Sequence, residues 1–340
     1  MTLLDKIHGS LAAACVADAM GAPTEEWAIE EIPQLFGGRV ETFFAPLPDA
    51  AYAKGRRAAQ ITDDSSQMLM LAEAFAAHNG VVTPEIMADL LVRWSGNPDY
   101  YPHFAGPTTR AAIERLAAGD DPWVVGREGA TMNVGASNGG AMRVAPAGLI
   151  HPGDIEGAVR AAQLTCVPSH NTSAGVAGAA AIAAAVAQAC VEGTTVLDVV
   201  RAAKQGAELG DQLGRREGRL VPAPSVARRI DLAASIAARS RTLDEAIRDI
   251  SDIVGTGLPA AEACPAAIGF FVAAQGDPFL TAVAAANAGG DSDTVGCMAA
   301  AISGAFTGLR GVPGDLVAQV ESANELQLGE VAGRLHAVAR

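Results

Sequence analysis

Basic, aromatic and cysteine residues are all scarce in this 340-residue chain, and each scarcity excludes a class of protein. Only 24 Lys and Arg stand against 38 Asp and Glu, which leaves a formal net charge of −14. Binding to nucleic-acid phosphates requires a basic face, and so does attraction to an anionic membrane surface. Neither a nucleic acid nor a membrane is therefore the expected main partner.

Aromatic residues make up only 4% of the chain, so large rings cannot fill its core. Ala and small aliphatic side chains must do so, and hydrophobic residues as a whole reach 50%. Small side chains let helices approach closely, and Ala has the highest helix propensity. Alternating β-branched runs are few. The composition therefore predicts an all-α protein.

Cysteines are few, odd in number and widely spaced, without any paired motif. They are Cys15, Cys166, Cys190, Cys264 and Cys297. This pattern excludes a disulfide framework and argues against a zinc site. Several of the five lie in apolar stretches, where a cysteine behaves as a small buried hydrophobe. We expect free thiols in a reducing cytoplasm.

Two apolar stretches could suggest a targeting signal or a membrane span. Residues 11–16 are apolar, but the stretch is short and Asp5 and Asp18 lie close to its two ends. They are better explained as part of a first helix than as a signal peptide. Residues 174–191 are mostly Ala, which contributes little to membrane insertion. This run predicts a buried central helix.

The chain shows no internal repeat, low-complexity tail or clear linker, so we expect one domain over residues 1–340. It should form a compact orthogonal bundle of many helices. The irregular stretches expected are residues 37–57, 96–107 and 126–146. After the first helix, further helices are expected at residues 29–36, 65–78, 84–95, 108–119, 157–167, 174–192, 196–213, 228–239, 243–254, 260–275, 277–288, 294–309, 313–323 and from residue 326.

Residues 289–294 read Gly-Gly-Asp-Ser-Asp-Thr and precede an Ala-rich helical run. The glycines allow a sharp turn, and carboxylates are favoured at a helix start because its first N–H groups are unpaired. Asp291, Asp293 and the Thr294 hydroxyl form an all-oxygen cluster that suits a hard cation such as Mg²⁺ or Mn²⁺. Taken alone, the motif could equally be an ordinary helix cap.

A second cluster of the same kind lies far upstream. Thr62, Asp63 and Asp64 open the helical run predicted at residues 65–78. Two such helix starts could converge on one dinuclear metal site in a central cleft. Four carboxylates gathered in one cleft would require cations to compensate their charge. The alternative is two unrelated caps.

With both clusters in order, the sequence resembles the ADP-ribosylglycohydrolase family, the relatives of dinitrogenase-reductase-activating glycohydrolase. Residues 18–25, Asp-Ala-Met-Gly-Ala-Pro-Thr-Glu, are similar to the family's Gly-Asp-Ala-Leu-Gly-Ala-Pro-x-Glu. Residues 138–143, Asn-Gly-Gly-Ala-Met-Arg, resemble its Asn-Gly…Met-Arg loop, and Ser169-His170 resembles its Thr-His. The similarity extends from about Gly9 to about Gly308.

The resemblance implies a hydrolase that cleaves the C1–N or C1–O bond of ribose in an ADP-ribosyl conjugate, on a protein or a small molecule. Two Mg²⁺ or Mn²⁺ ions would hold the ribose and activate water. The ligands that it implies are Thr62, Asp63, Asp64, Asp291, Asp293 and Thr294, with Asp64 and Asp293 also in the catalytic group.

Glu25 matches the acidic residue of the family's Gly-Ala-Pro-x-Glu segment. It is a candidate for the general base or for a lid contact, and its alternative role is surface solvation. Asp18 lies between apolar residues, so we expect a buried structural carboxylate that accepts backbone N–H groups. A direct role in the site is the alternative.

The Gly-rich loop predicts substrate contacts from Asn138, Gly139, Gly140, Met142 and Arg143. Its free N–H groups suit a pyrophosphate. His170 could bond a phosphate or simply order a loop.

The loop at residues 104–109, Phe-Ala-Gly-Pro-Thr-Thr, departs from the family. Activating glycohydrolases have Asp-x-Gly-x-Thr-Thr here, and Phe104 occupies the place of that Asp. Asp99 could substitute as a catalytic carboxylate, while Phe104, Tyr100 and Tyr101 could stack on a base or a neutral aglycone. We therefore expect a preferred substrate other than ADP-ribosyl-arginine.

Two further functions remain compatible with the residues. One is hydrolysis of a small N-riboside or nucleotide metabolite, and the other is a non-catalytic ADP-ribose or nucleotide sensor. Metal-dependent turnover discriminates between an enzyme and a sensor.

Overall fold

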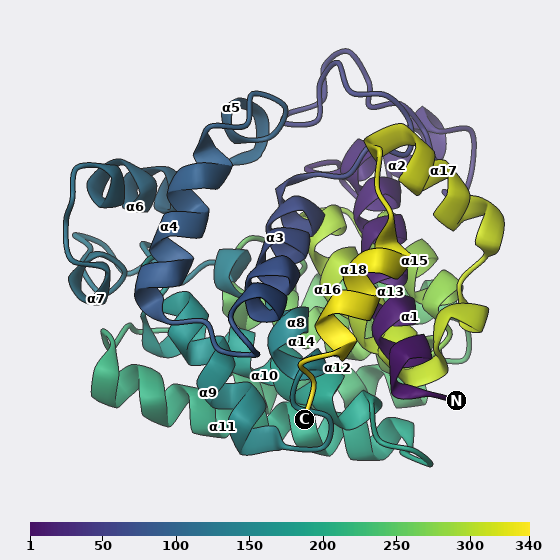
Figure 1. Ribbon diagram of the computed structural model, residues 1–340. Helices are drawn as coiled ribbons and strands as arrows, with labels where there is room; N and C mark the ends of the chain where they lie inside the picture. Colours follow the sequence, from purple (N-terminus) through teal and green to yellow (C-terminus); the bar gives the residue numbers. More distant parts are fainter.

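Two Ala-rich helices from opposite ends of the chain, α1 (Leu3–Gly21) and α16 (Ser292–Thr307), pack against each other inside the molecule (Figure 1). Glycines permit this close approach. A Cβ on Gly9 would lie 2.4 Å from the backbone carbonyl carbon of Gly308, and one on Gly21 would lie 2.6 Å from the Cα of Asp293. The two helices therefore meet backbone to backbone at both ends of their contact.

The computed structural model describes all 340 residues, and its regular elements are α-helices and short 3-10 helices without any β-strand. The all-α prediction is confirmed. The remaining α-helices are α2 (Ile32–Leu35), α3 (Asp63–Ala77), α4 (Pro84–Ser95), α5 (Tyr101–Phe104), α6 (Pro107–Ala117), α7 (Pro122–Val125), α8 (Ala145–Leu149), α9 (Ile155–Cys166), α10 (Ser173–Ala189), α11 (Val196–Glu217), α12 (Val226–Arg239), α13 (Leu243–Ile253), α14 (Ala260–Ala273), α15 (Pro278–Ala286), α17 (Gly314–Asn324) and α18 (Leu328–His336).

The predicted helices are present, with ends that differ by a few residues from the expected ones. The largest reduction is at residues 29–36, where only the single turn α2 forms. Three short helices were not expected: α5, α7 and α8. Each begins at or just before a proline, which is compatible with a first helical turn. These prolines stand in stretches whose composition is typical of loops, so the sequence did not predict the three short helices.

The predicted central helix is α10, which packs against α8, α9, α11, α12, α14 and α16. Its neighbour α11 contributes glycines at every fourth position. A Cβ on Gly206 would lie 2.4 Å from the carbonyl oxygen of Ala180, and one on Gly214 would lie 2.7 Å from the Cα of Ser173. Small residues on both helices thus build the close packing that the composition predicted.

The side chain of Lys6 links the C-terminal ends of α10 and α16. Its buried ammonium donates to the carbonyls of Ala189 at 2.6 Å and Ala305 at 3.2 Å, at the ends of α10 and α16. A positive charge is favoured there because unpaired carbonyls make a helix C-terminus negative.

All five cysteines are buried and unpaired, as predicted. None of the helices is both long and apolar enough to span a membrane.

Helices α4 to α7 lie together at one side of the molecule, in blue tones at the left of Figure 1. A core of 94 buried apolar residues runs from α1 to α18.

Candidate functional site

The first acidic cluster lies at the start of α3. Thr62 is the N-cap residue: its Oγ1 accepts from the Asp64 amide at 3.4 Å and donates to Asp64 Oδ2 at 2.9 Å. Asp63 and Asp64 occupy the first turn. Asp18 of α1 holds this turn from below, because its carboxylate accepts the backbone N–H groups of Thr62 at 3.1 Å and Ser65 at 3.0 Å. Asp18 is therefore the buried structural carboxylate that the sequence suggested.

The second cluster lies at the start of α16, after a glycine turn. Gly289 and Gly290 have φ values of 69° and 66°, which side chains rarely adopt. The turn is tied to two other loops: the Glu26 amide donates to the Gly290 carbonyl at 2.8 Å, and the Asp291 amide donates to the Thr256 carbonyl at 2.8 Å. Asn138 Nδ2 also donates to Asp291 Oδ2 at 2.5 Å. The Asp291 carboxylate is thereby fixed by a residue of the predicted Gly-rich loop.

The packing of α1 on α16 brings the two clusters together. Oxygen atoms of Asp18, Asp64 and Asp293 lie within 4.8 Å of one another, and so do oxygen atoms of Glu25, Asp291 and Asp293. Asp293 belongs to both groups. Two helix starts that are more than 200 residues apart in the sequence thus form one continuous acidic cluster.

The electrostatics of this cluster call for a cation. Burial, and then the charges of Asp63 and Asp18, raise the pKa of Asp64 well above its ordinary value. Burial, and then the charges of Glu25 and Asp64, do the same to the pKa of Asp293. Asp64 Oδ1 is also buried without any hydrogen-bond partner. An oxygen-only donor set with an unsatisfied buried oxygen fits a hard divalent cation.

Glu25 lies beside the cluster on the loop after α1. Its side chain is partly buried and lines the same cavity as the aspartates. Burial, and then the charge of Asp291, raise the pKa of Glu25 well above its ordinary value. Its predicted alternative, surface solvation, does not match this position.

A cavity of about 640 Å³ opens over the cluster. The predicted residues that line it are Glu25, Asp63, Asp64, Phe104, Asn138, Gly139, Met142, Asp291, Asp293 and Thr294. Thr62 does not line it; its hydroxyl instead holds Asp64 from within the helix start. Most of the predicted site therefore faces one common space.

Arg143, Gly140 and His170 were expected to contact substrate, but the structure places them behind the cavity wall. The fully buried Arg143 guanidinium donates to Gln67 at 2.8 Å and Ser169 at 2.8 Å. The His170 ring lies between the hydroxyls of Ser137 and Ser169, at 3.0 Å and 2.9 Å.

The surroundings of these buried groups explain their role. Burial lowers the pKa of His170 to about 3, so its ring is neutral at physiological pH. A Cβ on Gly140 would lie 2.8 Å from Cys166 Sγ, so that glycine makes room for close packing. These groups fasten the loop that carries Asn138 and Gly139, and a direct substrate contact from them is not supported.

Asp99 also lies apart from the cavity. Its side chain is exposed, and its backbone is held by the Asn97 side chain and by Arg56. Phe104 is 7% exposed and lines the cavity at the place where the family pattern has a carboxylate. The suggestion that Asp99 replaces that carboxylate is therefore not supported by its position.

One wall of the cavity, which the sequence did not predict, consists of Leu258, Pro259, Ala261 and Glu262. The Asn138 amide donates to the Leu258 carbonyl at 2.9 Å, which joins this segment to the Gly-rich loop. Gly255 has a φ of 89°, and a Cβ there would lie 2.8 Å from Glu262 Oε2. Glu262 and Arg229 line the cavity, 3.8 Å apart. The Gly-Thr-Gly sequence before a helix was the available signal for this wall.

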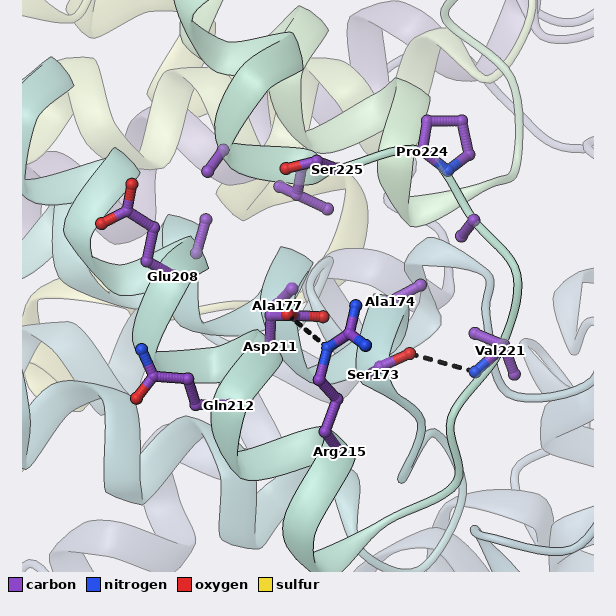
Figure 2. Close-up of a pocket in the computed structure, with 14 residues that line it drawn as sticks. Ser173, Ala174, Ala177, Glu208, Asp211, Gln212, Arg215, Val221, Pro224 and Ser225 are labelled. Atoms are coloured by element: carbon purple, nitrogen blue, oxygen red, sulfur yellow. Dashed lines mark hydrogen bonds and ion pairs between the residues drawn. The ribbon is translucent and has the colours of Figure 1, made fainter.

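A second cavity, of about 260 Å³, lies between α10, α11 and the segment that leads into α12 (Figure 2). Arg215 and Asp211 form an ion pair at 2.6 Å inside it, and Ser173 accepts from the Val221 amide at 3.1 Å. Ala223 and Pro224 line both cavities. No cluster of three or more possible metal-binding side chains lies in this second cavity.

The family model for ADP-ribosylglycohydrolase matches residues 1–340. The chain belongs to the ADP-ribosylglycohydrolase family. Membership makes it a hydrolase of the glycosidase type, in a family that is metal-dependent in general and acts on ADP-ribosylated substrates.

The similarity of this chain to two relatives and to one solved structure extends over most of its length. The uncharacterized protein YegU of Escherichia coli (strain K12) is 31% identical over 334 residues, covering 97% of this chain and 96% of YegU. An uncharacterized protein of Archaeoglobus fulgidus is 28% identical over 306 residues, covering 88% and 87%. A solved chain of an ADP-ribosylglycohydrolase-related protein complex superposes with a TM-score of 0.72 at 22% identity, covering 99% of both chains. At that identity, the superposition supports the fold alone.

Proposed function

We propose that this protein hydrolyses the bond between ribose C1 and a nitrogen or oxygen atom in an ADP-ribosyl conjugate, with two Mg²⁺ or Mn²⁺ ions in the acidic cluster. The observation that carries the proposal is the position of Asp293. Its carboxylate belongs to two adjoining groups of acidic oxygens, one with Asp64 and one with Asp291. Two neighbouring groups that share one carboxylate suit a dinuclear centre.

The ligands would be Asp63, Asp64, Asp291, Asp293 and Thr294, while the Thr62 hydroxyl holds Asp64 in place. When bound, the ions would supply Lewis-acid binding of ribose hydroxyls and a more acidic water. Asp18 holds the α3 start through backbone N–H groups, and Asn138 holds the Asp291 carboxylate. Such outer contacts orient ligands and affect metal affinity.

The other residues would bind and orient the conjugate. Glu25 would accept a proton from water, from its place beside Asp291 and Asp293. The nearby carboxylates would favour a positively charged, oxocarbenium-like ribose. Gly139 would give the diphosphate access to backbone N–H groups. A cavity of about 640 Å³ has room for more than a simple riboside.

Phe104 bears on the aglycone, the group that leaves ribose C1. Cleavage of an arginine N-glycoside requires help for a basic leaving group, and a phenyl ring cannot supply a proton or pair with a guanidinium. Asp99 lies outside the cavity lining. A hydroxyl-linked or neutral small-molecule aglycone is therefore the proposed preference.

A substrate panel with Mg²⁺ or Mn²⁺ tests the proposal: ADP-ribosyl-arginine, ADP-ribosyl-serine, O-acetyl-ADP-ribose and simple nucleosides. Metal-dependent turnover of an ADP-ribosyl conjugate supports it. Turnover of nucleosides alone would favour a riboside hydrolase, and ADP-ribose binding without turnover would favour a sensor. Asp293→Asn serves as the inactive control.

A further inference from the structure

The positively charged side chain of Arg56 packs against Phe104, the residue that occupies the place of the family's Asp. Its guanidinium carbon lies 5.5 Å from the ring centroid of Phe104 and 5.4 Å from that of Tyr100. Both distances are typical of cation–π contacts. Its terminal nitrogens donate to the carbonyls of Asp99 and Ile61, each at 3.0 Å. Arg56 takes part in none of the ion pairs of the structure, and its Nε is buried without a hydrogen-bond partner.

The Phe104 ring separates this charge from the catalytic cavity. Phe104 lines the cavity that holds the acidic cluster, whereas Arg56 does not. Phe104 and Arg56 also share a small neighbouring pocket with Ala22, Pro23 and Phe44. The ring therefore has the cavity on one side and an uncompensated cation on another.

We infer that Arg56 determines specificity by excluding a cationic aglycone from the Phe104 wall; the inference rests on the proposed function. The Phe104 ring already contacts the Arg56 guanidinium. A guanidinium of the substrate that packed on the cavity side of this ring would therefore be repelled by the positive charge of Arg56. Two like charges on the order of 10 Å apart inside a protein repel by roughly a factor of ten in binding. Neutral or anionic aglycones escape this repulsion.

The position of Arg56 also changes what a carboxylate at residue 104 would do. With Arg56 present, the carboxylate introduced by Phe104→Asp would pair with that guanidinium. It would then be held away from an arginine leaving group. Phe104→Asp alone should therefore give little arginine-directed activity, and Phe104→Asp combined with Arg56→Gln should give considerably more.

The ratio of kcat/KM for ADP-ribosyl-arginine to that for ADP-ribosyl-serine tests the inference. Arg56→Gln should raise this ratio about tenfold, while Arg56→Lys should leave it near the wild-type value because the charge remains. Arg57→Gln is the matched control and should not change the ratio, because the exposed Arg57 guanidinium donates to the Ala323 carbonyl and makes no cation–π contact with Phe104. Equal ratios for Arg56→Gln and Arg56→Lys would show a merely structural residue and overturn the inference.

A stability cycle tests the same charge without turnover. Unfolding is measured for wild type, Phe104→Asp, Arg56→Gln and the double variant. The double variant should be less stable than the sum of the single effects predicts, because the ion pair that only Phe104→Asp retains is stronger than the cation–π contact between Arg56 and Phe104 that both single variants lose. Additive effects would overturn the inference. Absence of turnover on every ADP-ribosyl conjugate would instead refute the proposed function, and the cycle would still decide whether the Arg56 charge acts at residue 104.

Discussion

The acidic cluster predicts that the metal-free protein loses stability as pH rises. Burial and mutual repulsion raise the pKa of Asp64, Asp293 and Glu25 well above their ordinary values. A carboxyl whose pKa is higher in the folded state binds more protons there than in the unfolded chain. Its stabilising contribution is therefore complete below the unfolded pKa, near 4, and is lost as pH rises towards the folded pKa.

The magnitude follows from proton linkage. Each carboxyl that stays protonated only in the folded state costs about 1.4 kcal/mol per pH unit. For a chain of this size this loss is roughly 2 °C in Tm per pH unit over the range between the unfolded and the folded pKa. Bound Mg²⁺ or Mn²⁺ should reverse the loss, because the ions bind only the native, ionised cluster.

The assay is unfolding in EDTA and in Mn²⁺ over this pH range, for wild type and two variants. Asp64→Asn should flatten the metal-free slope and remove much of the stabilisation by Mn²⁺. Glu114→Gln, an exposed change on α6, controls for lost net charge and should behave as wild type. A metal-free stability that is constant or rises from pH 5 to pH 7, or an equal slope in Asp64→Asn, would refute the reasoning.

Three further predictions concern the same cluster. Asp293→Ala and Asp63→Ala should each lower turnover by orders of magnitude while circular dichroism shows the fold retained; near-wild-type turnover in both would exclude a dinuclear mechanism. Gly21→Ala should lower both Tm and turnover, because its Cβ would lie 2.6 Å from the Asp293 Cα and push α1 from α16; an unchanged Tm would contradict this packing argument. Asn138→Ala should weaken metal affinity about 10–100-fold by releasing Asp291, and calorimetry with Mn²⁺ checks it.

The fold class and the meeting of the two acidic clusters could be predicted because local chemistry and tertiary structure agree there. Asp64 and Asp293 open helices, as first-turn carboxylates do, and their combined charge has a clear physical use. The structural role of Asp18 could be predicted as well, because a carboxylate buried in an apolar helix requires hydrogen-bond donors.

The positions of the other candidate site residues could not be predicted. They depend on whether a loop residue faces the cavity or the protein interior, which the neighbouring sequence does not determine. Arg143 and His170 are polar residues in a binding-type loop, yet they point into the protein and satisfy buried groups. Asp99 lies only five residues before Phe104, but it stands outside the α5 turn and its side chain is exposed to solvent. Glu262 faces the cavity because Gly255 leaves space for its carboxylate.

The pairing of α1 with α16 also governs the order in which the molecule can be completed during synthesis. At 5–20 residues per second, roughly 15–60 s separate the two helices on the ribosome. Until α16 has been synthesised, α1 lacks its principal packing partner, and the cluster around Asp64 lacks the carboxylates of Asp291 and Asp293. For most of its synthesis the nascent chain therefore contains the α1 segment without α16 to cover it, and no fragment that ends before residue 294 can assemble the complete acidic cluster.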